Sequence, residues 1–553
     1  MTTRRPTRVT RQSGRSRRSV LIVAVLVAGV GAAVGALVLR ISGNDSVIGG
    51  GSAYSEGVAG TWQRVNPLFS STNEADQDLV QLVYSGLVRL GPDGSVLPDL
   101  ADLPQLSDDG RTYTFKLRRN LSWHDGAPVT SRDISFTINR LTDPDFKGDP
   151  SLAEGWLGVD VETPDDRTVV VHLKQSSAPF LARSTTIGIL PQHLLGSLSS
   201  SALFEAPFNA APVGTGPFKV KSIDSREAVL VANTDYHLGR PGLDTIKLRF
   251  YPDYSSAVRG LTAGEVRGLM VRETLTESQI TELRKAKGMK TDQPQRGDYL
   301  LLYLNNDQAA YFQDERVRRA ISIALDRQAI VERVFFGFAK ASSSAIAPGS
   351  WAYAKAYDRP GPNLAEARKL LDEAGWKSHP TTGILLKDGG EFRFTIRTDN
   401  DPNRVAVATE IARQLEPLGI RATVASTTFS VLRRDFLQER KYDAAVTGWS
   451  QGPDPDPYFG WHSSQMGTAG LNLANFADTV SDELISKGRT ANDVEVRKDA
   501  YKQFQEVWDE LSPSVVIAYP QYLYAHTDSL GGMNLGVLFN GSLRFADAYK
   551  WHE

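Results

Sequence analysis

The chain has 553 residues, of which 41% are hydrophobic and 23% are charged, and its formal net charge is -2. This composition is typical of folded proteins, and at about 100 to 200 residues per domain the length leaves room for about three to four domain-sized units. The absence of cysteine excludes disulfides, thiolate metal sites, cysteine nucleophiles and a lipid anchor on cysteine.

The net charge hides an uneven distribution along the chain. Residues 1–40 contain eight arginines and no acidic residue, so the remaining 513 residues carry 54 basic and 64 acidic side chains. A mildly acidic body lacks the clustered lysines and arginines that phosphate binding requires. We therefore expect no nucleic-acid partner.

The N-terminal region contains an uncharged apolar segment, Val20–Leu39, which is long enough to span a bilayer core of about 30 Å. Seven arginines precede it and one follows, which predicts the N-terminus inside and the body outside. An uncleaved anchor is favoured over a signal peptide, because the apolar run exceeds about 15 residues and lacks a good cleavage site. The stretch Ser16-Arg17-Arg18-Ser19-Val20-Leu21 resembles a twin-arginine export signal, or is ordinary flanking charge. We expect a basic cytoplasmic tail at 1–19, the anchor at 20–39 and a flexible glycine-rich linker at 40–57.

The first part of the body is rich in predicted strands. Runs of β-branched and aromatic residues between turn signals are typical of strands. Tyr299–Asn305 is nearly all apolar, as in a strand buried on both faces. The other predicted strands are Thr112–Leu117, Thr168–Leu173, Lys219–Ile223, Ala228–Ala232 and Ile246–Phe250.

Helices and strands alternate in the later part, in the order expected of a parallel sheet with helical crossovers. Ligands collect at the carboxyl ends of such strands, and residues 449–463 start at one of these ends. The predicted helices are Glu315–Leu325, Arg404–Leu418, Ser430–Arg440 and Val494–Leu511; the predicted strands are Phe392–Arg397, Ile420–Val424, Tyr442–Gly448 and Val515–Tyr524.

Three interpretations are compatible with the segment at 449–463: a catalytic carboxylate pair, a metal site or the wall of a solute pocket. Its sequence is W-S-Q-G-P-D-P-D-P-Y-F-G-W-H-S. Asp454 and Asp456 stand too close together to flank a scissile bond, and the chain has no G-x-S-x-G or H-E-x-x-H motif. The glycine-punctuated calcium loop is missing, so an Asp-Pro loop that is simply rigid is favoured over a metal site. We therefore expect that the protein is not an enzyme and that it binds neither a metal ion nor a cofactor.

The pocket interpretation depends on the aromatic residues of the same segment. Aromatic faces such as Trp449 and Tyr458 can cover apolar parts of a ligand, while backbone groups at a strand end bind its polar atoms. Proline holds the loop in one shape, which lowers the entropy lost on binding. The alternative is that these aromatic residues belong to the core.

Five blocks occur in a fixed order along the chain: Asn66-Pro67-Leu68 with V-Y-S-G-L-V-R-L (83–90), the stretch 106–134 that contains F-K-L-R-R-N-L-S-W-H-D-G, P-V-G-T-G-P-F-K-V (212–220), D-E-R-V-R-R-A-I-S-I-A-L-D-R (314–327) and N-L-A-E-A-R-K-L-L-D-E-A-G-W (363–376). With these blocks, the chain from about Gly60 to its C-terminus resembles the large solute-binding proteins of ABC importers. This is the family 5 group, which includes oligopeptide-, dipeptide- and nickel-binding proteins.

The resemblance implies an α/β, two-lobed, periplasmic-binding-protein-like fold of type II, in the large cluster with an extra strand-rich subdomain, next to the transmembrane helix. We expect lobe I at 58–304 and 520–553, with the subdomain at about 91–190, and lobe II at 305–519. Tyr299–Asn305 and Val515–Tyr524 would be the crossing segments. The lobes would close on a solute by a hinge motion, and the closed form would dock on a permease.

The resemblance also implies binding residues. In peptide-binding members, the strand matching Gly448–Gln451 pairs with the ligand backbone, and an Asp three residues after the Trp receives the peptide amino group. Here that position is Gly452, which weakens the peptide assignment, although Asp454 or Asp456 can substitute. His124-Asp125-Gly126 resembles a turn element of the family rather than a site. The ligand-binding candidates are Trp449, Ser450, Gln451, Asp454, Asp456, Tyr458, Asn66 and Asn305.

The sequence therefore predicts an extracytoplasmic solute receptor of an ABC importer with a monomeric body, held to the membrane by its N-terminal helix, with ABC permease subunits as partners. An oligopeptide or dipeptide is the expected solute. The alternatives are a ligand-binding sensor or scaffold on the same fold, and a binder of a non-peptide solute such as a metal chelate or a sugar.

Overall fold

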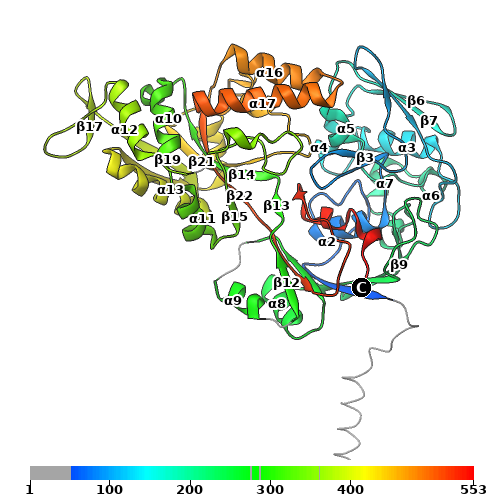
Figure 1. Cartoon of the computed structure of the whole chain (residues 1–553). Helices are drawn as coiled ribbons and strands as arrows, with labels where there is room; N and C mark the ends of the chain where they lie inside the picture. Colours follow the sequence, from blue (N-terminus) through cyan, green and yellow to red (C-terminus); the bar gives the residue numbers. More distant parts are fainter. Residues whose placement is uncertain (1–51, 274–276, 286–287, 360) are drawn as a thin grey trace, which may run out of the picture. The chain divides into compact units, whose positions relative to one another are not determined.

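Two large β-sheets organise the chain in the computed structural model, which describes residues 52–273, 277–285, 288–359 and 361–553 (Figure 1). The expected cytoplasmic tail, the anchor and most of the linker lie outside the described residues. Among the described helices, none combines the length and the apolar character needed to cross a membrane.

The first sheet has seven strands in the order β12-β23-β11-β1-β10-β9-β8. Strand β1 runs parallel to β10 and β11, and the other neighbours are antiparallel. Strands from the beginning and from the end of the described chain, β1 and β23, therefore belong to the same sheet, and both ends of the chain contribute to the first lobe. The strands are β1 (Ala53–Ala59), β8 (Phe218–Ile223), β9 (Glu227–Ala232), β10 (Thr245–Tyr251), β11 (Gly268–Val271), β12 (Met289–Asp292) and β23 (Leu523–Thr527), and the helices beside them are α2 (Glu74–Val83), α8 (Tyr254–Thr262) and α9 (Glu277–Lys285).

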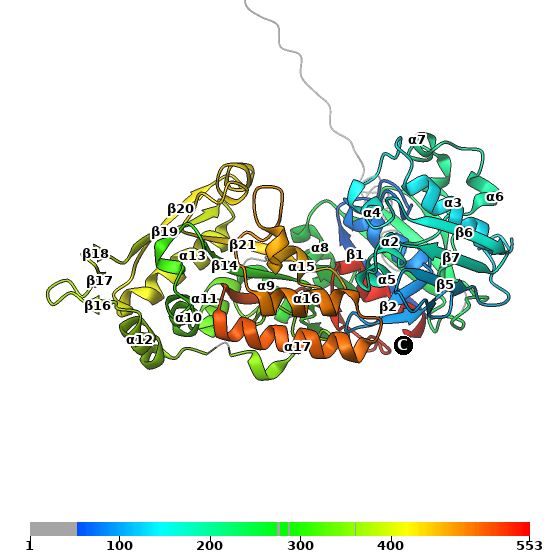
Figure 2. The same ribbon diagram turned by 90° about the horizontal axis from the view of Figure 1, so that it is seen from above.

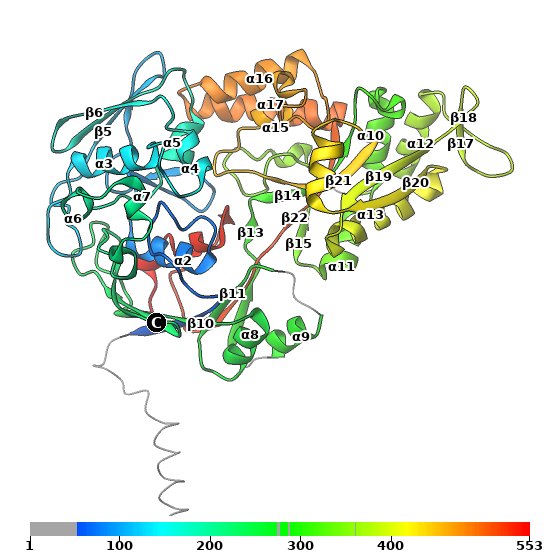
Figure 3. The ribbon, with the colours of Figure 1, turned by 180° about the vertical axis from the view of Figure 1, so that it is seen from behind.

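A smaller four-stranded sheet, in the order β4-β5-β7-β6, belongs to the same lobe (Figure 3). Helix α3 (Ser131–Leu141) packs against it through Ile134, Ile138 and Leu141, which are buried in the same core as Val169 and Val171. The strands are β4 (Gln105–Leu106), β5 (Thr112–Lys116), β6 (Asp160–Asp165) and β7 (Thr168–His172); nearby are the hairpin β2 (Val88–Leu90) and β3 (Val96–Pro98) and the helices α4 (Pro150–Glu154), α5 (Pro179–Ser184), α6 (Gln192–Leu195) and α7 (Ser200–Leu203).

The second large sheet has six strands in the order β15-β22-β14-β21-β19-β20. The strands are β14 (Asp298–Leu304), β15 (Ala339–Ala341), β19 (Arg393–Asp399), β20 (Arg421–Thr427), β21 (Ala444–Ser450) and β22 (Ser514–Pro520). The helices are α10 (Glu315–Ala324), α11 (Arg327–Phe335), α12 (Leu364–Glu373), α13 (Pro402–Leu415), α14 (Phe429–Val431), α15 (Tyr458–Trp461), α16 (Thr479–Thr490) and α17 (Val494–Leu511), and β16 (Lys377–Ser378), β17 (Leu385–Lys387) and β18 (Gly390–Glu391) form a small separate sheet.

Strand β14 is buried on both faces, as its apolar sequence predicts. Leu300 and Leu302 point toward the helices α10, α11 and α13, whereas Leu301 and Tyr303 point toward α17. This alternation follows from the period of two of an extended strand. The parallel β-α-β arrangement is confirmed, because β19 runs parallel to both β20 and β21.

Two predicted elements differ from the structure. The α-helix expected at 430–440 is present only as the short α14, which ends at Val431 and continues as a π-helical turn, Leu432–Leu437. In this turn the backbone bonds span five residues, as from the Gln438 N–H to the Arg433 carbonyl at 2.9 Å. The strand expected at 515–524 is divided between β22 and β23, which lie in different sheets. The chain crosses between the lobes at Gln521, whose N–H binds the Phe338 carbonyl at 3.0 Å instead of a strand neighbour.

The lobes are joined by the segments 293–297 and 521–522. Strand pairing places β14 in the second sheet, so a boundary drawn by pairing precedes Asp298 instead of following residue 304.

Figures 1 and 2 show α16 and α17 reaching from the second lobe to α5 of the first. There the Ala178 N–H donates to the Arg489 carbonyl at 3.0 Å. The Trp351 N–H likewise donates to the Asp93 carbonyl at 3.2 Å, so the two lobes are also in direct contact at a second place.

Candidate functional site

Strand β21 has one edge that is only partly paired. It pairs with β14 from Ala444 to Ser450, but it pairs with β19 only at Ala444 and Ala445. In the described pairing, residues 446–450 therefore have no strand neighbour on the β19 side. A Cβ atom on Gly448 would meet only the Tyr299 carbonyl oxygen within 4 Å, at 3.7 Å. An extended chain can approach such an edge and hydrogen-bond to it.

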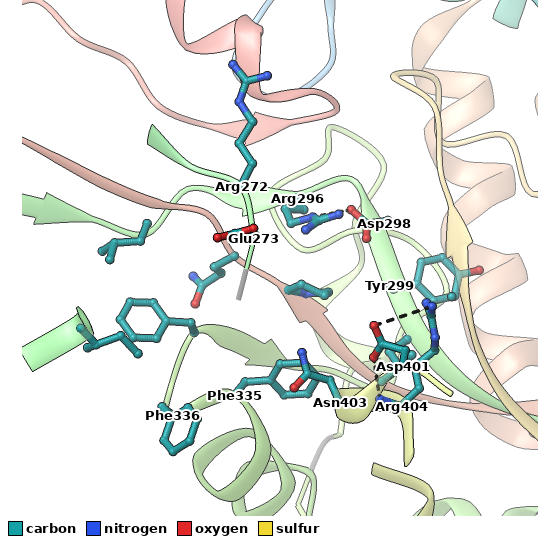
Figure 4. A pocket seen from close by; sticks show the side chains of 17 residues that line it. Arg272, Glu273, Arg296, Asp298, Tyr299, Phe335, Phe336, Asp401, Asn403 and Arg404 are labelled. Carbon is teal, nitrogen blue, oxygen red and sulfur yellow. Dashed lines mark hydrogen bonds and ion pairs between the residues drawn. The ribbon is translucent and has the colours of Figure 1, made fainter. Parts of the chain in front are cut away.

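A cavity of about 240 Å³ lies beside this edge, and Gly448 forms part of its lining (Figure 4). Its walls come from the first lobe after β11, from both crossing segments, and from the second lobe at the ends of α11 and β19. The cavity therefore lies between the two lobes. Its lining consists of Arg272, Glu273, Ile280, Arg296, Asp298, Tyr299, Leu300, Phe335, Phe336, Phe338, Asp401, Asn403, Arg404, Gly448, Pro520, Gln521 and Leu523.

The three arginines of the lining all have carboxylate partners. The Arg272 guanidinium forms a short ion pair with Asp78, which lies outside the lining. Arg296 Nε lies 2.8 Å from Asp298 Oδ1. Arg404 Nε lies 2.8 Å from Asp399 Oδ1, and this pair fixes the start of α13 against the end of β19. The positive charges of the cavity are thus largely compensated within the protein.

Glu273 adds a carboxylate that has no ion-pair partner among the described residues. Burial raises its pKa, and the nearby carboxylates of Glu74 and Asp253 raise it further. Figure 4 shows its side chain between Arg272 and Arg296. A carboxylate in this environment can accept a cationic group of a solute, because such a group relieves the repulsion between the acids.

Aromatic side chains form much of the apolar wall. Tyr299 and Phe335 are buried, whereas Phe336 is 43% exposed. Figure 4 shows the Phe335 ring beside Asn403, with Phe336 farther out at the edge of the cavity. Aromatic walls with a few placed polar groups are typical of sites for small molecules.

The D-P-D-P loop after β21 is held by arginines of α16 and α17. Both carboxylate oxygens of Asp454 accept hydrogen bonds from Arg497 Nη2, at 2.8 and 2.9 Å. Asp456 forms a short ion pair with Arg489. The loop is further tightened by the Asp456 N–H, which donates to Asp454 Oδ1 at 3.1 Å. These contacts hold the loop against α16 and α17. A role of the two aspartates in solute binding stays a prediction.

The other candidates of this segment lie outside the described lining of the cavity. The half-buried Trp449 packs on α15, where a Cβ atom on Gly460 would lie 3.2 Å from the indole ring. Ser450 is exposed, and the buried Gln451 side chain accepts a backbone N–H at 3.2 Å. The Tyr458 hydroxyl forms a 2.9 Å hydrogen bond with a neighbouring serine. Solute binding by these four residues stays a prediction.

Asn66 and Asn305 are fully buried and bind other parts of their own lobes. Asn66 Nδ2 donates to Asn209 Oδ1 at 2.9 Å. Asn305 Nδ2 donates to the carbonyls of Arg440 and Tyr442, at 2.8 and 2.9 Å. Both side-chain amides thus form hydrogen bonds within the protein that stabilise the fold. Binding of the solute by Asn66 and Asn305 stays a prediction.

Four residues of the lining are not among the candidates predicted from the sequence: Glu273, Phe336, Asp401 and Arg404. A signal existed for the last two, because Asp401-Pro402 is a typical helix start that comes shortly after the predicted strand Phe392–Arg397. Parallel strands present their carboxyl ends at one edge of a sheet, and β19 runs parallel to β21, so this start lies at the same edge as the end of β21. In the described ranges, no group of three or more His, Cys, Asp and Glu residues is placed to hold a metal ion.

Comparison with known proteins places these features in a family. The family described as bacterial extracellular solute-binding proteins, family 5 Middle, matches residues 95–470. The oligopeptide-binding protein AppA of Bacillus subtilis is 32% identical over 481 residues, which cover 84% of this chain and 86% of AppA. Protein XP55 of Streptomyces lividans is 28% identical and is matched over 96% of this chain and 95% of its own length.

Solved structures show the same α/β periplasmic-binding-protein fold. Bacillus subtilis AppA in complex with a nonapeptide superposes with a TM-score of 0.61 and 29% identity, over 91% of this chain and 99% of AppA. NikZ of Campylobacter jejuni in complex with Ni(L-His) gives a TM-score of 0.64 and 26% identity, also over 91% of this chain and 99% of NikZ. Proteins that match at this level bind a peptide in one case and a metal chelate in the other.

Proposed function

Because this chain belongs to the bacterial extracellular solute-binding proteins, family 5, we propose that it captures a short peptide between its two lobes and delivers it to an ABC permease. Membership of the family makes it a solute-binding protein of an ABC transporter and not an enzyme. The peptide as solute is the part that we propose. It is supported by AppA, whose structure holds a nonapeptide.

The free edge of β21 is the observation that supports a peptide most directly. Residues 446–450 leave backbone groups without a strand neighbour in the described pairing, and Gly448 allows another backbone to come close. A peptide can add to such an edge as an extra strand, with main-chain hydrogen bonds giving affinity and side-chain pockets giving specificity. The adjacent cavity would then receive one of its side chains.

Titration calorimetry with backbone-methylated peptides tests this pairing. Peptides of about three to nine residues should bind. N-methylation of a residue whose N–H faces β21 should weaken binding about tenfold, because the lost hydrogen bond is worth about 1 kcal/mol and the methyl group adds a clash with the strand. Methylation at the alternate residues, whose N–H groups point away, is the matched control. Equal losses at both sets of positions would refute strand addition.

A non-peptide solute is the second candidate. It is favoured by Gly452, which stands where peptide-binding members of the family carry the Asp that receives the peptide amino group. The complex of NikZ with Ni(L-His) shows that a protein similar to this chain binds a chelate. Titration with nickel and histidine under the same conditions separates the two candidates, because only the chelate binder responds.

We also propose the finer placement that the sequence predicts. The fold would be the type II arrangement with the strand-rich subdomain, and the extracytoplasmic body would be tethered by Val20–Leu39. Fractionation of cells, with the intact chain recovered in membranes, would support the tether. Recovery of the chain in the soluble fraction alone would argue against it.

A further inference from the structure

Phe336 has an unusual backbone conformation for its residue type. Helix α11 ends at Phe335, and Phe336 follows with φ 51° and ψ 30°, in the left-handed region. Gly337 follows with φ 83°, which glycine adopts freely. The left-handed conformation costs an L-residue about 1 to 2 kcal/mol, whereas glycine adopts it freely. Of the non-glycine residues with positive φ in the described ranges, Phe336 is the single aromatic one.

Packing within the protein does not account for this phenylalanine. Its side chain is 43% exposed, although the neighbouring Phe335 is buried in the core between β14 and the helices of the second lobe. The position therefore combines backbone strain with an apolar ring in contact with water. Both features would be relieved by glycine, so neither serves the stability of the helix end. A strained residue that the fold maintains at a site is a basis for inferring function there.

The surroundings of Phe336 indicate what its ring would contact. It lies at the edge of the cavity, and the neighbouring apolar lining comes from both lobes, including Ile280 and Leu523 of the first lobe and Phe335 of the second. The arginines of the lining are paired with acids. An apolar side chain that entered from the β21 edge would thus meet aromatic and aliphatic groups.

We propose that Phe336 is a specificity-determining residue, whose ring covers a bulky apolar side chain of the bound solute. This inference rests on the proposed function and narrows it to short peptides that carry an aromatic or large aliphatic residue at the position beside Gly448. Burial of the exposed ring against the solute side chain supplies the preference, and the strain of the free protein is tolerated for this reason.

Two variants and paired peptides test the proposal. Peptide pairs that differ only by Ala or Phe at one position are titrated against the full chain and against Phe336→Gly. The full chain should prefer the Phe peptide about tenfold at one position, and the variant should reduce that preference to about threefold or less. Phe336→Leu should keep most of the preference, because it keeps an apolar side chain. Phe429→Ala, which removes an aromatic side chain that is 51% exposed and lies outside the lining, should change nothing.

Thermal unfolding separates specificity from structure. The melting temperature of Phe336→Gly should equal or exceed that of the full chain, because glycine relieves the left-handed strain. A lower melting temperature, with equal losses for Ala and Phe peptides, would overturn the proposal in favour of a structural role. An unchanged preference in Phe336→Gly would overturn it directly.

Failure of the proposed function gives a different result. If the full chain binds no peptide of the set, the peptide assignment is wrong. The full chain and Phe336→Gly are then compared by the solutes that co-purify with each protein, as identified by native mass spectrometry. Phe336→Gly should then lose the solutes with bulky apolar groups. An identical set of solutes on both proteins would overturn the role of Phe336.

Discussion

At the scale of single residues, His124 makes the stability depend on pH. The Gly214 N–H donates to its Nδ1 at 3.2 Å, and its Nε2 donates to the Gly216 carbonyl at 3.0 Å, so the ring is neutral. Burial, together with the charge of Lys219, lowers the pKa of His124 from 6.5 to about 4. The unfolded chain therefore binds a proton between pH 6.5 and about 4 that the folded chain does not bind. The free energy of unfolding must fall as the pH falls through this window.

Chemical denaturation at pH 7 and pH 5 measures this effect. Between these values, His124 should account for about 2 kcal/mol of lost stability, at about 1.4 kcal/mol per pH unit below 6.5. His124→Asn keeps a polar group but cannot titrate, so its stability should fall by about 2 kcal/mol less over the same interval. Equal pH dependence in the two proteins would show that the imidazole is not the responsible group.

For the two aspartates of the D-P-D-P loop, the sequence predicts their position at a strand end but not the partners of their side chains. The predicted strand placed Asp454 and Asp456 at a strand end, and the structure has them there. Their partners Arg497 and Arg489 follow 43 and 33 residues later, on two helices. A choice between a solute and an arginine as the partner of a buried acid depends on how those helices pack, which the local pattern does not contain. The backbone strain at Phe336 also cannot be predicted from the local sequence, because its φ angle depends on how the folded helix ends.

At the scale of elements, the Asp454–Arg497 pair joins the loop after β21 to α17. Both side chains are almost fully buried, at 4% and 7% exposed. Asp454→Asn leaves the Arg497 charge buried without its acid, and loss of one partner of a buried pair costs about 3 to 5 kcal/mol. We expect urea unfolding to show a loss of about 3 kcal/mol. Replacement of both residues by apolar ones should cost less, because no charge then remains buried.

Asp435→Asn is the matched control for this prediction. Asp435 pairs with Arg434, but both side chains are largely exposed, at 43% and 68%. Exposed pairs contribute about 1 kcal/mol or less. If the two substitutions had equal effects on stability, the loop would not depend on the buried pair.

The elements that the sequence predicts well are those with a strong local pattern. Helix α17 has the predicted bounds, Val494–Leu511, because Asp493 caps its start and Ser512 ends it in the left-handed region ahead of Pro513. The prediction fails where tertiary contacts decide. The pattern at 430–440 is amphipathic, yet the chain forms a π-helical turn that ends at Leu437, and Arg440 follows with φ 55°. The run 515–524 is apolar in sequence except for Gln521, although Pro520 ends one strand and the chain changes sheets after it.

At the scale of the whole molecule, we expect closure of the lobes to depend on Gly297 in the first crossing segment. Gly297 precedes β14, and its N–H donates to the Leu538 carbonyl at 3.2 Å. A Cβ atom at this position would lie 2.5 Å from the Phe539 ring and 3.1 Å from the Gln451 carbonyl oxygen. Gln451 belongs to the second lobe, and Phe539 follows β24 (Val537–Leu538), which pairs with β13 (Gln295–Arg296). Gly297 therefore lies at the crossing between a residue of the second lobe and the segment that follows β24.

Gly297→Ala should hold the lobes partly open. Overpacking of this kind costs about 1 to 3 kcal/mol in the closed state, and the open state avoids it, so the solute affinity should fall about tenfold. Small-angle scattering at saturating solute should show a larger radius of gyration than for the unaltered chain. Gly361→Ala is the control, because a Cβ atom there meets nothing within 4 Å. If Gly297→Ala bound its solute with unchanged affinity and contracted as fully as the control, the crossing would not be the point at which closure is limited, and the hinge would have to lie elsewhere in the two joining segments.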